Sequence, residues 1–159
     1  MSIFVTSTAA PAARTADSTK ISVLYAVVLV AFAVTQLFTF EAFLPYIQSL
    51  QLPLGKSFNY ILAPLLVVAE IFAIPFLLRM RLSPAFRYMS MGLGCVAAVL
   101  WIFITLWINL SNVLVETVGF LGDVVTLTPG WWAVFISLSL GVLAVWSSWG
   151  LWPGTRSAS

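Results

Sequence analysis

The sequence predicts an all-α integral membrane protein, a four-helix bundle with its N- and C-termini in the cytoplasm. The composition carries the first part of this prediction, because 62% of the 159 residues are hydrophobic and only 8% are charged. Soluble domains are about 45–50% apolar and about 25% charged. Too few polar side chains remain to cover a surface that faces water. We therefore expect lipid around most of the chain, and four long apolar runs to cross it.

Residues 1–19 come before the first apolar run and are rich in Ala, Thr and Ser, which predicts a flexible polar tail. A cleaved secretory signal has an apolar region of about 7–15 residues. The first run here is longer, and a retained helix is the better interpretation.

Four apolar runs reach the length of about 20 residues that a membrane-spanning helix needs. They cover residues 22–43, 59–78, 88–108 and 131–151, inside a membrane domain of residues 20–152 that a short tail, 153–159, follows. None shows the alternation of a lipid-facing barrel strand. Ser83-Pro84 and Thr128-Pro129 each place a capping hydroxyl before a proline that suits the first helical turn. These pairs predict the starts of the third and fourth helices.

The basic residues predict the orientation, because loops rich in Lys and Arg stay in the cytoplasm. With four spans, the two termini and the middle loop share one side. That side holds six of the seven basic residues, Arg14, Lys20, Arg79, Arg81, Arg87 and Arg156, and the other side holds Lys56. Both termini are therefore expected in the cytoplasm.

Two segments are expected on the outer side. Residues 45–58 predict a short loop punctuated by Pro and Gly. Residues 109–130 carry Glu116 and Asp123 and an apolar centre. This second segment is expected either to lie along the membrane surface or to fold back over the mouth of the bundle.

Glu70 is the most informative candidate, because it lies near the middle of the second span. An ionised carboxylate is costly there, so we expect Glu70 to be protonated and to face the bundle interior. Its expected hydrogen-bond partners are Gln36, Ser137, Ser139 and the carbonyls of Tyr60 and Ile71, which Pro64 and Pro75 free. A structural strut and a proton-linked or ligand-binding carboxylate are equally weighted interpretations.

The other polar candidates carry weaker signals. Glu41 lies near the outer end of the first span and is expected to be hydrated. The arginines of the middle loop are expected to meet anionic lipid headgroups. The chain has no His and one cysteine, Cys95, which is expected to be buried and inert. No motif for a metal or a cofactor is found, and no basic stripe for nucleic acid.

The stretch LPLGKSFNYILAPLLVVAEIFAIPFLLRMRLSPAFRYMSMGLG, residues 52–94, resembles the DoxX/MauE-like family of small four-helix membrane proteins. Glu70 and Arg87 match the family's mid-helix Glu and the Arg that opens its third helix. The resemblance implies an inner-membrane protein linked to thiol redox or to maturation of a partner enzyme. Some members carry a Cys-Gly-Cys-Phe-Gly motif in the last outer loop. In the corresponding residues 118–122 both cysteine positions are apolar, which removes the dithiol.

Three functions follow as hypotheses. The first is a non-enzymatic DoxX/MauE-like accessory protein of the bacterial inner membrane that holds or stabilises a membrane or envelope partner. The second is an oligomeric transporter or channel that uses Glu70 for a proton or a cation. The third is an enzyme or redox component with an external cofactor, although a lone thiol cannot cycle between dithiol and disulfide. We favour the first, with the bilayer and a membrane protein or a second copy as partners and no bound cofactor.

Overall fold

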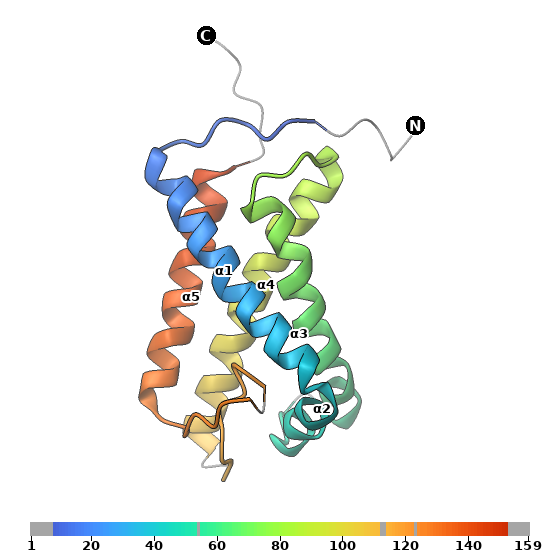
Figure 1. The fold of residues 1–159 in the computed structure, drawn as a ribbon. Helices are drawn as coiled ribbons and strands as arrows, with labels where there is room; N and C mark the ends of the chain where they lie inside the picture. The colour runs from blue at the N-terminus through green and yellow to red at the C-terminus, as the bar shows by residue number, and fades with distance from the viewer. Residues whose placement is uncertain (1–7, 54, 112–113, 123, 153–159) are drawn as a thin grey trace.

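The computed structural model describes residues 8–53, 55–111, 114–122 and 124–152 (Figure 1). These residues form five helices and no strand, which confirms the all-α class. The helices are α1 (Ala16–Phe38), α2 (Phe40–Ser49), α3 (Lys56–Leu77), α4 (Pro84–Ser111) and α5 (Trp131–Gly150). The predicted C-terminal tail, 153–159, and residues 1–7 lie outside the described residues.

Helix α1 begins and ends earlier than the predicted span 22–43. Thr15 caps it, because the Thr15 hydroxyl oxygen accepts a hydrogen bond from the backbone N–H of Ser18 at 3.1 Å. The helix ends at Phe38, and Thr39 separates it from α2. The first turn of α1 therefore uses residues that were predicted to be tail.

Residues 8–15 lie across the end of the bundle. The Thr8 N–H donates to the Leu82 carbonyl at 3.1 Å, and the Arg14 N–H donates to the Gly150 carbonyl at 2.9 Å. Figure 1 shows this segment passing over the end of the bundle, where α5 ends and the loop between α3 and α4 lies. The described part of the predicted tail is thus attached to the helical domain.

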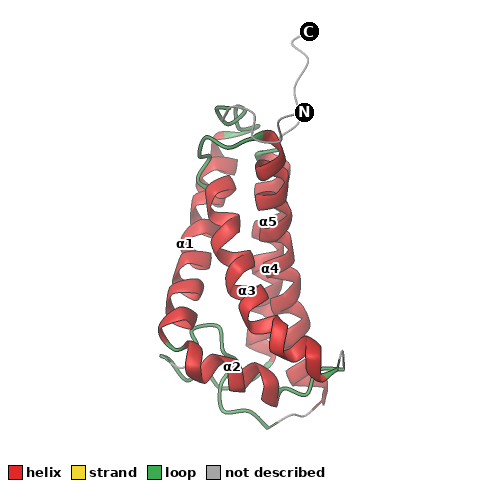
Figure 2. Cartoon of the chain, turned by 90° about the vertical axis from the view of Figure 1, so that its right-hand side faces the viewer, coloured by secondary structure: helices red, strands yellow, loops and turns green. Residues whose placement is uncertain are grey.

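Helix α2 corrects the prediction of a loop at residues 45–58. The ten residues of α2 form a separate short helix, with Pro45 inside it. It lies crosswise beneath the long helices, at the end opposite residues 8–15 (Figure 2). Phe43 and Ile47 are buried, so the helix caps the bundle with one apolar face.

The three remaining helices lie close to their predicted spans. Ser83 caps α4 as predicted, because its hydroxyl oxygen accepts from the Phe86 N–H at 3.3 Å. The cap predicted at Thr128 is wrong: the residue before α5 is Gly130, which has no side chain to cap with. The Thr128 carbonyl instead accepts the indole N–H of Trp132 at 3.0 Å.

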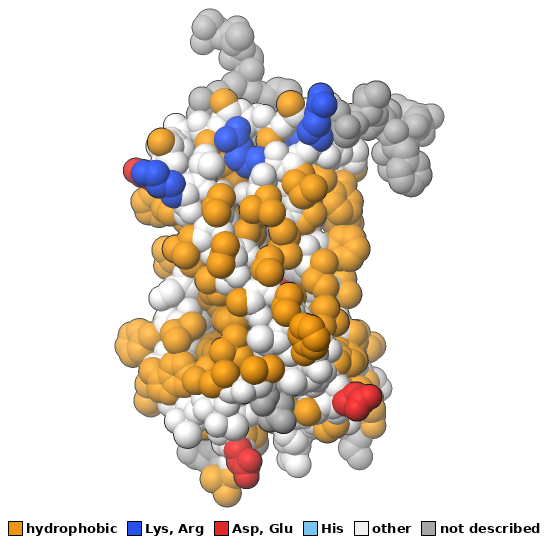
Figure 3. All heavy atoms as spheres, viewed as in Figure 1, with side chains coloured by type: hydrophobic (Ala, Val, Ile, Leu, Met, Phe, Trp, Pro, Cys, Tyr) orange, Lys and Arg blue, Asp and Glu red, His pale blue; other side chains and the backbone are white. Residues whose placement is uncertain are grey.

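The four long helices form a bundle in which α1 and α4 each pack against both α3 and α5. Each is long and apolar enough to cross a membrane. On the face shown in Figure 3, hydrophobic side chains gather between the two ends of the bundle. Trp131, Trp149 and Trp152 are about half exposed near the ends of α5, where their rings suit the membrane interface. The chain is therefore a multi-pass membrane protein.

Candidate functional site

Glu70 lies in the middle of the bundle with its side chain completely buried. Its Oε1 atom accepts two hydrogen bonds from other helices. The indole N–H of Trp101 on α4 donates at 2.8 Å, and the amide Nε2 of Gln36 on α1 donates at 3.3 Å. One oxygen atom of α3 thus joins three of the four spanning helices.

Gln36 connects this cluster to the segment between α4 and α5, which was predicted to lie on the outer side. We call this segment, within residues 112–130, the outer segment. The Nε2 atom of Gln36 also donates to the Phe120 carbonyl at 3.2 Å. Phe120 and Val118 are buried, so this segment folds back into the mouth of the bundle, one of the two predicted arrangements. Asp123, one of its two predicted acids, lies outside the described residues.

Aromatic rings enclose the polar cluster. The ring of Phe120 stacks on Phe32 with centroids 5.3 Å apart and lies 4.7 Å from the ring of Trp101. Phe32 meets Trp101 edge-on at 5.9 Å. The hydrogen bonds to Glu70 therefore form in an apolar surrounding, where water competes little and each bond is strong.

Two oxygen atoms of the cluster are buried without a hydrogen-bond partner in the described part of the chain, Oε2 of Glu70 and Oε1 of Gln36. Leaving such an acceptor unpaired costs about 1–3 kcal/mol. Chemically, the free carboxyl oxygen can hold a proton or accept a further donor. The cluster can therefore act as a brace between helices or as a proton site, and these are the two interpretations that the sequence left open.

The sequence predicted one partner of Glu70 correctly and missed the stronger one. Gln36 is confirmed. Ser137 instead exchanges a hydrogen bond with Thr105 at 2.8 Å, and Ser139 is exposed and bonds within its own helix to the Phe135 carbonyl. Trp101 was not among the partners expected for Glu70. The missed signal is its position far from the helix ends, because a buried indole N–H needs a partner.

The arginines at the other end bind the chain's own backbone. Arg87 is buried and donates to the carbonyls of Thr8 at 2.8 Å and Ala9 at 3.2 Å. Arg79 donates to the Pro11 carbonyl at 3.1 Å. Two of the three arginines expected to meet lipid headgroups are thus used to hold residues 8–15, and Arg81 is exposed.

The structure does not bring the other predicted site residues to Glu70. Arg87 precedes Trp101 by fourteen positions on α4, a rise of about 21 Å. Glu41 is exposed in the first turn of α2. Glu70 and Arg87, the two residues that match the family's polar positions, therefore lie in separate places. Glu70 is in the bundle centre and Arg87 is at the arginine-rich end.

A hydrogen bond from Tyr46 connects helix α2 to the outer segment. The Tyr46 hydroxyl donates to the Val118 carbonyl at 2.7 Å. Burial raises the pKa of this hydroxyl, which ordinarily already lies above neutral, so the hydroxyl remains a donor over a wider pH range. We call α2 and residues 114–122 together the outer cap.

The described residues contain no group of three or more His, Cys, Asp or Glu side chains placed to hold a metal ion. Cys95 corrects a prediction, because it is partly exposed rather than buried. Its sulfur lies 3.3 Å from the Ser148 hydroxyl of α5. Neither observation gives the thiol a redox partner.

Comparison with known proteins finds no relative of this chain. No family model matches the chain, and no curated protein or solved structure matches it. The fold and the site define a multi-pass helical membrane protein with a polar cluster at its centre.

Proposed function

We propose that this chain is a non-enzymatic, DoxX/MauE-like accessory protein of the bacterial inner membrane that supports the assembly or stability of a membrane or envelope partner. The observation that carries the proposal is the use of the central carboxyl group. Glu70 accepts from Trp101 and Gln36, and the Gln36 amide also donates to the Phe120 carbonyl. A carboxyl group engaged in this way favours a rigid scaffold that presents its ends to a partner.

The arrangement of charges supports termini in the cytoplasm. Basic side chains gather at the end where residues 8–15 lie, where Asp17 pairs with Lys20, and the opposite end shows acidic side chains (Figure 3). Arg156 lies outside the described residues, and so does the Lys56 side chain. The positive end is the one expected to stay in the cytoplasm.

The outer segment offers the partner a contact surface. Leu114 is completely exposed, and Val124 and Val125 are 57% and 42% exposed. Glu116 is also exposed in the same segment. Apolar side chains rimmed by polar ones are typical of protein contact sites, and here they are presented by a segment that Gln36 and Tyr46 hold in place.

A photo-crosslinking residue at Leu114 tests the proposal in native membranes. We expect one reproducible protein adduct from position 114. The control is the same residue at Val27, which is 60% exposed on the lipid side of α1, and only lipid adducts are expected there. Protein adducts at neither position, together with isolated chain after mild detergent extraction, would refute the accessory role.

One observation favours a transporter or channel as a second candidate. Oε2 of Glu70 and Oε1 of Gln36 are buried acceptors without a partner among the described residues, and they could receive a proton or a cation. One four-helix chain offers little room for a water-filled path, so this function requires an oligomer. Proton or cation flux into liposomes, compared between the native chain and Glu70→Gln, decides it. Equal flux in both, or none in either, removes this candidate.

A further inference from the structure

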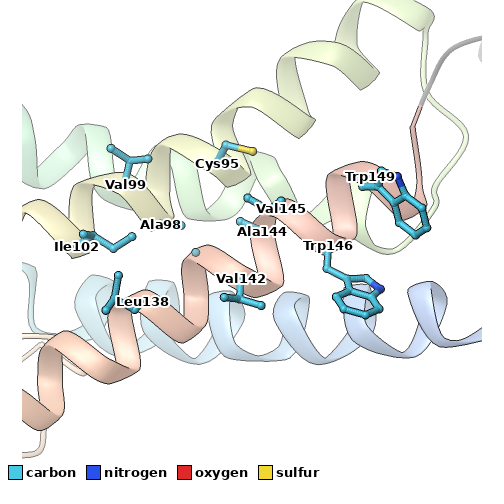
Figure 4. Close-up of a pocket in the computed structure, with 11 residues that line it drawn as sticks. Cys95, Ala98, Val99, Ile102, Leu138, Val142, Ala144, Val145, Trp146 and Trp149 are labelled. Carbon is cyan, nitrogen blue, oxygen red and sulfur yellow. The ribbon is translucent and has the colours of Figure 1, made fainter.

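An apolar groove runs between α4 and α5 on the outside of the bundle (Figure 4). It encloses about 720 Å³, and its lining is almost entirely apolar. Small residues shape it, because Ala98, Gly141 and Ala144 leave the space that larger side chains would fill. A volume of this size is within the range of about 300–1,000 Å³ seen in small-molecule sites.

The groove has the depth of one membrane leaflet. It extends along α5 from Leu138 to Trp149, eleven positions apart, which is a rise of about 16 Å. The hydrocarbon core of a bilayer is about 30 Å thick. The groove thus reaches from the arginine-rich end of the bundle to near the bilayer centre.

The positively charged Arg14 lies at the end of the groove that is nearest the arginine-rich end of the bundle. The guanidinium carbon of Arg14 lies 4.9 Å from the ring centroid of Trp149, which lines the groove. The Arg14 backbone N–H bonds to the Gly150 carbonyl at 2.9 Å, which fixes this residue beside the end of α5. The ion pair found in the described residues joins Lys20 to Asp17, so no described carboxylate forms an ion pair with Arg14.

We propose that the groove binds one anionic glycerophospholipid, with an acyl chain between α4 and α5 and the headgroup phosphate on Arg14. The apolar lining matches the chain, and the charge at one end matches an amphiphile with a single anionic head. An arginine stacked on an aromatic ring keeps its in-plane N–H donors free for a phosphate oxygen. This inference does not depend on the accessory function.

Native mass spectrometry of the full chain in a neutral detergent tests the proposal, with phosphatidylglycerol and phosphatidylcholine of the same acyl chains as probes. We expect one phosphatidylglycerol molecule to be retained about fivefold more than phosphatidylcholine, the preference that one basic residue near the surface supplies. Arg14→Gln should abolish this preference. Lys20→Gln, at the same end, should leave it unchanged.

A second pair of variants tests the groove itself. Val145 is 66% exposed and lines the groove beside Cys95 (Figure 4), whereas Val27 is 60% exposed on α1, which does not line it. Val145→Phe should reduce the retention of both lipids, and Val27→Phe should not. Both changes lie on exposed positions, and a melting curve of each variant shows that the bundle is intact.

Several results would overturn the proposal. Equal retention of the two lipids by the native chain would remove the role of Arg14, and unchanged retention by Val145→Phe would remove the groove. A second copy of the chain in the groove is the competing occupant. It would appear as a homodimer by mass and as a Cys95–Cys95 crosslink with a short bifunctional maleimide.

Discussion

The indole nitrogen of Trp101 lies 2.8 Å from Oε1 of Glu70 and joins α4 to α3 at a position where neither side chain is exposed. Trp101→Phe keeps an aromatic ring at this position, although a smaller one, and removes the indole donor. We expect the free energy of unfolding to fall by about 1–3 kcal/mol, because Oε1 of Glu70 loses one of its two donors and the smaller ring fills less of the buried space. Titration with sodium dodecyl sulfate in mixed micelles measures it. Trp146→Phe, at a half-exposed position, is the control, and an equal loss in both variants would contradict the role of this bond.

The carboxyl group of Glu70 provides a second test, because its substitutes differ in hydrogen bonding. Glu70→Gln keeps a carbonyl oxygen for the donors of Trp101 and Gln36, so we expect a change in unfolding free energy of less than about 1 kcal/mol. Glu70→Leu leaves the indole N–H of Trp101 without its acceptor and the Gln36 amide with only the Phe120 carbonyl, and should cost about 2–5 kcal/mol. The same titration measures both. If Glu70→Leu were as stable as the native chain, the brace that supports our functional proposal would not exist.

Arg87 fixes residues 8–15 through the carbonyls of Thr8 and Ala9. Arg87→Ala removes these donors, so the segment should detach from the loop at Leu82. We expect faster deuterium exchange at the Thr8 amide, which donates to the Leu82 carbonyl in the native chain. Arg81→Ala serves as the control because Arg81 is exposed, and exchange as slow in Arg87→Ala as in this control would show that other contacts hold the segment.

Two glycines give opposite predictions for the same substitution. Gly122 has φ +57°, and a Cβ there would lie 3.0 Å from the Thr35 carbonyl oxygen. Gly122→Ala should therefore destabilise the outer segment by about 1–3 kcal/mol. A Cβ at Gly92 in α4 meets nothing within 4 Å, so Gly92→Ala should stabilise the helix by about 0.5–1 kcal/mol. Thermal melting in detergent compares the melting temperatures of the two variants with that of the native chain. If both melting temperatures shifted in the same direction, the two glycines would not differ in their surroundings as described.

Tyr46 links the two parts of the outer cap through the Val118 carbonyl. Tyr46→Phe removes the bond and should increase deuterium exchange at the Val118 amide, which donates to the Leu127 carbonyl in the native chain. Tyr60→Phe, at a 60% exposed position, is the matched control. Unchanged exchange in Tyr46→Phe would show that packing alone holds the cap.

The short elements were harder to predict than the long ones. Residues 45–49 of α2 were expected to lie in a loop because Pro45 and Gly55 suggest turns, yet the buried face of α2 on the bundle stabilises a helix that includes the proline. The start of α1 was placed six residues late, because a polar first turn hides the cap at Thr15. Thr128 was expected to cap α5, but α5 begins after Gly130, and the Thr128 carbonyl accepts the indole N–H of Trp132.

The sequence by itself determined that four helices cross a membrane and that Glu70 faces inward. Both follow from a local rule, since each residue's cost in hydrocarbon depends on its own chemistry and its position along a span. Only the tertiary structure decided that Trp101 and Gln36 share one oxygen of Glu70, that Phe120 closes the bundle, and that Arg14 stands at the end of the groove. These contacts join residues far apart in the chain, and they depend on how the helices are rotated and offset against one another, which their hydrophobic pattern does not specify.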